Sequence, residues 1–179
     1  MRRLNRRVFF KTTGLSVGTA ALFYRCHEPV ETWNFLSDRE VGVLEAMLEQ
    51  IIPSDEDPGA REAGVIYFID RQLVGPYERF QSIYREGLAS VEATSRSLFD
   101  RSFSGLNSDD QVSLLHRLEK DEAGQEFRKS RQASSFFQMV VDHAMQGFYG
   151  SPIHGGNKDF LSHEMLGIEL PIDYRRPRS

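Results

Sequence analysis

Apolar residues recur along most of the chain at intervals of three and four, the spacing that places side chains on one face of an α-helix. The first such run follows Ser37, and Glu40 stands three positions further on, which is the pattern of a helix-capping box. We expect the first helix to extend from Ser37 to about Ile52, where Pro53 ends it. Its predicted apolar positions are Val41, Leu44, Met47, Leu48 and Ile51.

The same spacing predicts further helices over 60–74, 77–101, 108–120 and 132–148, and a helical turn over 160–166. Gly75-Pro76 separates the second helix from the third, and a capping box over Ser108–Gln111 is expected to open the fourth. Strand-like alternation is never longer than a few residues, and no internal repeat occurs. The sequence therefore predicts an all-α fold, an irregular bundle of about five helices with a Gly/Pro-rich C-terminal loop region.

A different pattern precedes the first helix. Paired Arg6 and Arg7, with Phe9 and Lys11 nearby, are followed by a short apolar stretch over 12–24. This order is typical of a twin-arginine export signal, with Asn5 where Ser or Thr is more usual, and that route carries proteins that are already folded. A bilayer span needs about 20 predominantly apolar residues, so the stretch suits a signal or a weak anchor. We expect a signal segment over residues 1–30 and a helical domain over 31–179.

The net charge of −4 conceals a strong asymmetry. Six of the 22 Lys and Arg residues precede His27, whereas all 26 Asp and Glu residues follow it, so the remainder has a net charge of −10. An acidic domain repels phosphate backbones, which disfavours a nucleic-acid role. Cys26 is the only cysteine, which excludes an internal disulfide and zinc or iron–sulfur sites built from several cysteines.

Three histidines in the C-terminal third are the first candidates for chemistry. His143, His154 and His163 lack the i, i+4 spacing of metal ligands on one helix face, and their neighbouring carboxylates are adjacent in sequence rather than one turn away. We interpret them as solvated or hydrogen-bonded side chains. A metal site or an active site built from these three residues stays open as the alternative.

Carboxylates and glycines supply the other candidates. Asp55, Glu56 and Asp57 lie between Pro53 and Pro58-Gly59, which indicates an acidic turn facing solvent. Gly155-Gly156-Asn157 has neither a preceding strand nor a following Lys-Ser or Lys-Thr, so it matches neither a P-loop nor a dinucleotide fingerprint. From these patterns the sequence predicts no catalytic, cofactor-binding or metal-binding residue.

Two stretches do resemble a known family. Residues 51–65, IIPSDEDPGAREAGV, resemble the segment IIP-x-D-x-x-PGA-x-x-AGV of the gluconate 2-dehydrogenase subunit 3 family. Residues 148–157, FYGSPIHGGN, resemble the C-terminal YYG-x-P-x-x-GGN motif of the same family. Together with the signal in front, the resemblance extends over essentially the whole chain.

This resemblance implies an accessory role. Members of the family are small, cofactor-free subunits of sugar or sugar-acid dehydrogenases, thought to assist folding and export of a large flavoprotein of the glucose–methanol–choline type. The partners implied are that FAD-containing subunit and a multihaem cytochrome c. The location implied is the periplasm, with membrane association through the complex or through an uncleaved signal segment.

The two motif segments are the predicted contact loops for such a partner. The interface candidates are Pro53, Asp55, Pro58, Gly59, Gly64, Tyr149, Gly150, Pro152, Gly155, Gly156 and Asn157. The other hypotheses are a stand-alone periplasmic enzyme or metal-binding domain that uses His143, His154 and His163, and a free-standing periplasmic helical binding protein.

Overall fold

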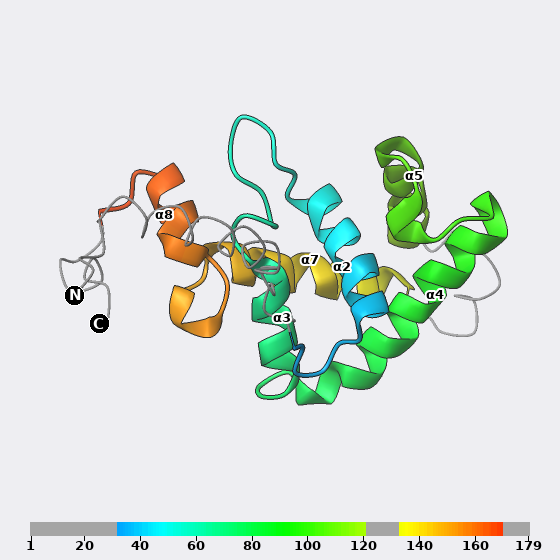
Figure 1. Cartoon of the computed structure of the whole chain (residues 1–179), viewed down its shortest axis with the longest axis horizontal. Helices are drawn as coiled ribbons and strands as arrows, with labels where there is room; N and C mark the ends of the chain where they lie inside the picture. The colour runs from blue at the N-terminus through cyan, green and yellow to red at the C-terminus, as the bar shows by residue number, and fades with distance from the viewer. Residues whose placement is uncertain (1–31, 121–132, 170–179) are drawn as a thin grey trace, which may run out of the picture. The chain divides into compact units, whose positions relative to one another are not determined.

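A computed structural model of the chain describes residues 32–120 and 133–169 (Figure 1). The residues of the predicted export signal, Arg6, Arg7, Phe9 and Lys11, lie outside this range, as does the polar link predicted over 121–131. The described elements are α-helices and short 3-10 turns, without a strand among them, which confirms the all-α prediction. They all belong to a unit that begins at Trp33.

The long helices follow the predicted runs closely. They are α2 (Asp38–Ile51), α3 (Val65–Leu73), α4 (Gln81–Phe99), α5 (Ser108–Glu119) and α7 (Ala133–Tyr149), and the short α8 (Leu161–Met165) matches the predicted C-terminal turn. The 3-10 turns are η1 (Glu78–Phe80), η2 (Phe103–Gly105), η3 (Pro152–His154) and η4 (Lys158–Phe160). The Ser37–Glu40 capping box at the start of α2 is present, because each side chain bonds the backbone N–H of the other.

Three predicted helix starts are wrong. The second helix begins at Val65 rather than near Ala60, because Gly64 at its N-cap is left-handed with φ 67°, a conformation that interrupts an α-helix. The third helix begins at Gln81 rather than near Tyr77, because Glu78–Phe80 form the 3-10 turn η1. The fourth helix is capped by Asn107, whose side chain accepts a hydrogen bond from the Asp110 N–H at 2.9 Å. Ser108, the predicted cap, instead donates its hydroxyl to Gln50 of α2 at 3.0 Å. Asn is as effective an N-cap as Ser, so the helix starts one residue earlier.

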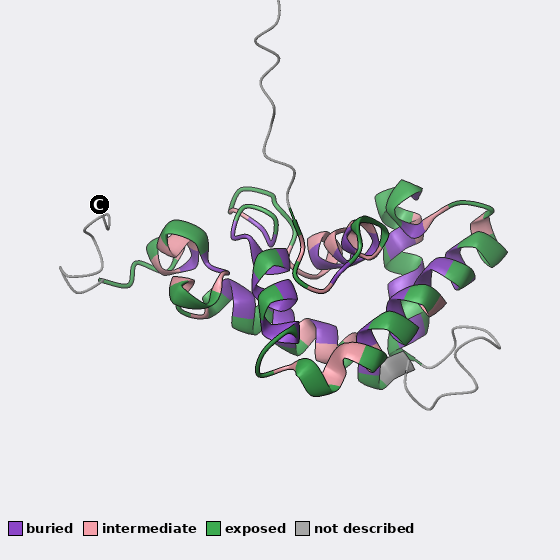
Figure 2. Cartoon of the chain, turned by 60° about the horizontal axis from the view of Figure 1, so that its bottom comes forward, coloured by how far each residue is buried: buried purple, intermediate pink, exposed green. Residues whose placement is uncertain are grey.

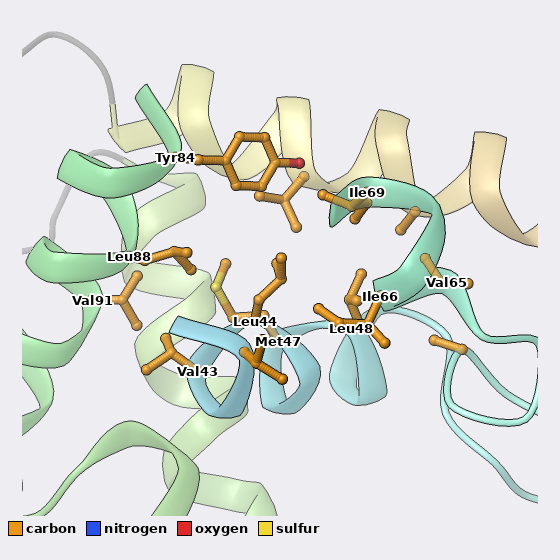
Figure 3. Packing of buried hydrophobic residues seen from close by; sticks show 14 of the residues in the cluster. Val43, Leu44, Met47, Leu48, Val65, Ile66, Ile69, Tyr84, Leu88 and Val91 are labelled. Carbon is orange, nitrogen blue, oxygen red and sulfur yellow. The ribbon is translucent and has the colours of Figure 1, made fainter. Parts of the chain in front are cut away.

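The core lies where α2, α3, α4 and α7 meet (Figure 3). Leu44, Met47 and Leu48 of α2 point toward Ile66 and Ile69 of α3 and toward Tyr84 and Leu88 of α4, and the buried faces of the helices turn toward one another (Figure 2). α7 also packs against α5 and α8. Leu98 of α4, Val112 of α5 and Met145 of α7 are apolar but exposed.

A buried carboxylate joins the start of the domain to this core. Asp70 of α3 accepts hydrogen bonds from the backbone N–H groups of Asn34, Phe35 and Leu36 at 2.7, 3.0 and 2.9 Å. Burial alone would raise the pKa of Asp70, but the N–H groups of Leu36, Asn34 and Phe35 outweigh it, so its pKa lies below the ordinary value. Trp33 stacks on Tyr67 at 5.3 Å, which holds the same segment against α3.

Candidate partner-binding site

The two motif segments, 83 to 106 residues apart in sequence, come together in space. The Lys158 N–H, at the end of the second segment, donates to the carbonyl of Ala63 in the first at 3.0 Å. From the helix that follows the first segment, Arg71 donates to the Ile153 carbonyl at 3.1 Å and Gln72 donates to the His154 carbonyl at 3.3 Å. We call residues 53–65 and 149–158 together the loop pair.

Glycines allow close backbone approaches within the first segment and between the second segment and α7. An added Cβ at Gly156 would clash with the carbonyl oxygen of Gly147 in α7, and one at Gly59 would lie 2.6 Å from the Ser54 backbone nitrogen. Gly155 has φ 108°, a region that other residues rarely adopt. Gly59 and Gly156 therefore act as spacers between backbone segments.

Asn157 fixes the turn that these glycines form. Its side chain is fully buried, it donates to the Gly150 carbonyl at 2.8 Å, and it accepts from the Ser162 N–H at 2.9 Å. Asn157 itself has φ 44°, and Asn is among the residues that tolerate this left-handed region best. The Asn of the second motif therefore ties the end of α7 to the start of α8.

The interface candidates fall into three groups by exposure. Gly59, Gly64, Gly156 and Asn157 are buried; Pro58, Gly150, Pro152 and Gly155 are partly buried; Pro53, Asp55 and Tyr149 are exposed. The buried group positions the loops and the exposed group is available to another molecule. Their contact with a partner stays a prediction.

The carboxylates of the first segment form the solvent-facing turn that the sequence predicts. Asp55 and Asp57 are exposed, and the Asp57 N–H donates to the Asp55 carboxylate at 2.9 Å. Glu62 accepts the Ser54 hydroxyl at 2.6 Å and the Gly59 N–H at 3.0 Å, and chiefly the Ser54 hydrogen bond lowers the pKa of Glu62. The carboxylates therefore shape the loop.

A shallow apolar groove of about 630 Å³ adjoins the loop pair. It lies between the end of α3 and the end of α7, and its lining residues are Phe68, Gln72, Pro76, Tyr77, Met145, Gln146, Tyr149, Gly150 and His154. Met145 and Tyr149 are 44% and 40% exposed, and the neighbouring Ile153 is 63% exposed. Exposed apolar and aromatic side chains around a groove are the usual composition of an interface centre.

His143, beside this groove, is the most perturbed of the three histidines. Its ring stacks on that of Tyr77 with centroids 4.1 Å apart and lies nearly parallel to that of Tyr84 at 5.9 Å, and its Nδ1 lies 2.9 Å from the Tyr84 hydroxyl. Burial lowers the pKa of His143 to about 4, with Asp142 opposing the shift and Arg79 adding to it. The burial of Tyr84 raises the pKa of its phenol, so Tyr84 keeps its proton and shares a hydrogen bond with His143.

The histidines are not brought together. The His154 side chain is exposed, and the Nε2 atom of His163 lies 3.3 Å from the Tyr149 carbonyl oxygen. His143, in contrast, is enclosed by aromatic rings. In residues 32–120 and 133–169, no group of three or more His, Cys, Asp or Glu side chains is arranged to hold a metal ion. The described part of the chain also contains no helix with the length and hydrophobicity that a bilayer span requires.

Sequence reasoning missed Asp70 and the partners of His143. A signal for Asp70 was present, since it directly follows the apolar run Val65–Ile69 and lies one turn from Ile66 on the buried face. No local pattern indicates that Tyr77 and Tyr84 enclose His143, because that contact depends on how α4 packs on α7.

Comparison with known proteins is limited to one match. The family model described as gluconate 2-dehydrogenase subunit 3 matches residues 38–169, which include both motif segments and every helix described. No curated protein and no solved structure matches the chain.

Proposed function

The chain belongs to the gluconate 2-dehydrogenase subunit 3 family, and from this we propose that it is a non-catalytic accessory subunit that binds a flavin-dependent large subunit. In this proposal the large subunit is of the glucose–methanol–choline type and holds the FAD, while this chain holds no cofactor. The chain assists the folding of the large subunit and its export by the twin-arginine route to the periplasm. A multihaem cytochrome c joins the same complex, which associates with the membrane.

The observation that carries the proposal is that the two family motifs meet in space and that the second of them, through Tyr149, Gly150 and His154, lines an apolar groove. The buried glycines and Asn157 hold the loop pair in a fixed conformation, and Tyr149, Met145 and Ile153 are exposed beside it. A rigid loop binds with a smaller loss of conformational entropy than a mobile one. A preorganised apolar surface suits a subunit whose task is to bind another protein.

Export of the large subunit is the direct test. Replacing Arg6 and Arg7 by lysine in the native host should leave the flavin-containing large subunit in the cytoplasm, because the proposal makes this chain the source of the export signal. Flavin and dehydrogenase activity are measured in periplasmic and cytoplasmic fractions, and the wild-type chain with an affinity tag should co-purify with the large subunit. Normal periplasmic activity in the double variant, with no large subunit on the tagged chain, would refute the proposal.

The groove beside the loop pair is tested separately. Ile153→Glu should weaken binding of the large subunit by about tenfold or more, since it places a charge on the exposed apolar surface next to the groove and desolvating that charge is costly. Because the side chain is 63% exposed, the thermal midpoint should stay close to wild type. Leu98→Glu on α4 is the matched control, an exposed apolar residue away from the loop pair. Equal affinities for both variants would place the interface elsewhere.

A further inference from the structure

A second groove lies between α2 and α4, and it shares no lining residue with the groove beside the loop pair. Its volume is about 390 Å³. Val43 of α2 and Leu88, Ala89 and Ala93 of α4 give it an apolar floor. Ala89 and Ala93 are exposed, and their short side chains leave room between the two helices for an incoming side chain.

Three arginines stand around this floor, namely Arg39, Arg85 and Arg96. The charge of Arg85 is neutralised by the Glu40 carboxylate, which lies 2.9 Å from its guanidinium. The same guanidinium donates to the Phe35 carbonyl at 3.2 Å and stacks over the Phe35 ring. Arg85 thereby fixes the start of the domain against α4.

The other two arginines share a single carboxylate. Arg39 Nη2 lies 3.3 Å from Glu92 Oε1, and Arg96 lies 2.9 Å from the same oxygen through both Nε and Nη2. The second oxygen of Glu92 accepts the buried Phe103 N–H at 3.0 Å. Two guanidinium groups therefore face one negative charge, which leaves an excess positive charge at the groove.

That excess charge is available to a ligand. The side chains of Arg39 and Arg96 are 69% and 58% exposed, although each keeps a bond to Glu92 that limits its movement. The chain after His27 has a net charge of −10, so a basic groove here is a local reversal of sign. Guanidinium groups bind carboxylates with two parallel hydrogen bonds, which gives orientation as well as affinity.

We propose that this groove binds an acidic segment of the flavin-dependent large subunit. The segment places an apolar side chain on the floor at Ala89 and Ala93 and an Asp or Glu carboxylate against Arg39 and Arg96. This inference rests on the proposed function and adds a second contact to it. The acidic turn of another copy of this chain, Asp55–Asp57, fits less well, since its residues are charged and offer no apolar side chain for the floor.

Two single variants test the groove through different properties. Arg39→Gln removes the less firmly held cation and leaves the Arg96–Glu92 pair in place, while Ala93→Trp fills the floor without a change of charge. Each should weaken binding of the purified large subunit by about tenfold, measured by biolayer interferometry, with the far-UV spectrum and thermal midpoint of the chain unchanged. The loss in Arg39→Gln should shrink as salt is raised, because an exposed charge pair is screened. Arg117→Gln on α5, also exposed, is the matched control and should bind as wild type does.

The outcomes separate this inference from the proposed function. If the wild-type chain binds the large subunit and both groove variants bind equally well, the groove inference is overturned and the proposed function stands. If the wild-type chain does not bind, both fail. Self-association of the isolated chain that disappears in Arg39→Gln would also overturn the inference, because it would assign the groove to a second copy.

Discussion

Lowering the pH from 7 to 4 should remove about 3 kcal/mol of folding stability through His143 alone. The pKa of this imidazole falls to about 4 in the fold against an ordinary value near 6.5, and each pKa unit corresponds to about 1.4 kcal/mol. The unfolded chain therefore binds a proton at a pH where the folded chain does not. His143 therefore stabilises the fold fully at a pH above its pKa in the unfolded chain, and this stabilisation is lost as the pH falls toward its pKa in the fold.

The surroundings of His143 explain why the fold excludes the proton. Tyr77 stacks on the ring with centroids 4.1 Å apart, and Tyr84 lies nearly parallel to the ring with its hydroxyl 2.9 Å from Nδ1, so little of the imidazole meets water. Arg79 opposes the charged form and Asp142 favours it, but burial is the largest cause of the shift. A protonated ring would have to leave this stack or take the cost of a buried charge.

The measurement is urea unfolding at several pH values between 4 and 7.5. His143→Phe keeps a flat ring between the two tyrosines and removes the titrating group, so its stability curve should be flatter by about 3 kcal/mol across this window. The mutation also leaves the Tyr84 hydroxyl without its hydrogen-bond partner, which lowers stability at every pH and does not change the slope. His154→Gln, at an exposed position, should follow the wild-type curve. If the unfolding free energy of His143→Phe depended on pH as steeply as that of the wild type, His143 would not be the source of the pH dependence.

Asp70 acts in a different pH window. The pKa of Asp70 in the fold lies below its ordinary value, so Asp70 stabilises the fold fully at any pH above the pKa it has in the unfolded chain. This stabilisation is lost only as the pH falls through the pKa in the fold, under stronger acid than affects His143. The hydrogen bonds it accepts hold residues 34–36 on α3, so this segment should detach first in strong acid.

Helix positions and buried faces were predictable from sequence because they depend on local periodicity. The apolar positions of α2 and α3, from Val41 to Leu73, are buried almost without exception, since one helix face must meet the core. Helix starts were less predictable. The left-handed Gly64 and the cap at Asn107 each depend on one residue, and neighbouring residues could have served as well.

The candidate site was predictable only in part. Both motifs could be recognised in the sequence, but their meeting in space depends on the bond from Lys158 to Ala63 and on two contacts across 82 residues. The division of the motif residues into buried spacers and exposed contacts also follows from that meeting. The groove between α2 and α4 has no local signature, because Arg39 and Arg96 are brought to Glu92 by helix packing.

The glycine spacers imply that the second motif is needed first for folding and only then for binding. Gly156→Ala should destabilise the chain by about 3 kcal/mol, the upper part of the usual range for overpacking a core. The added methyl group would meet the Gly147 carbonyl oxygen and would lie 2.9 Å from its carbon, and both are backbone atoms that no rotamer change can move. Gly147 cannot retreat, because its own Cα faces Phe68 and Val65 of α3. The turn held by Asn157 would have to shift instead, which breaks its bond to Gly150.

Thermal unfolding followed by circular dichroism measures this loss, with Gly42→Ala as the matched control. Gly42 lies within α2, and an added Cβ there meets nothing closer than the Ser104 hydroxyl at 3.9 Å, so this change should stabilise the chain by about 0.5 to 1 kcal/mol.

Gly156→Ala should also lower the yield of the complex with the large subunit, and lower temperature should restore part of it, because the defect lies in folding. Ile153→Glu should show the opposite pattern, with normal stability and weak binding at every temperature. A fully stable Gly156→Ala chain that nevertheless fails to bind would instead make Gly156 a direct contact residue.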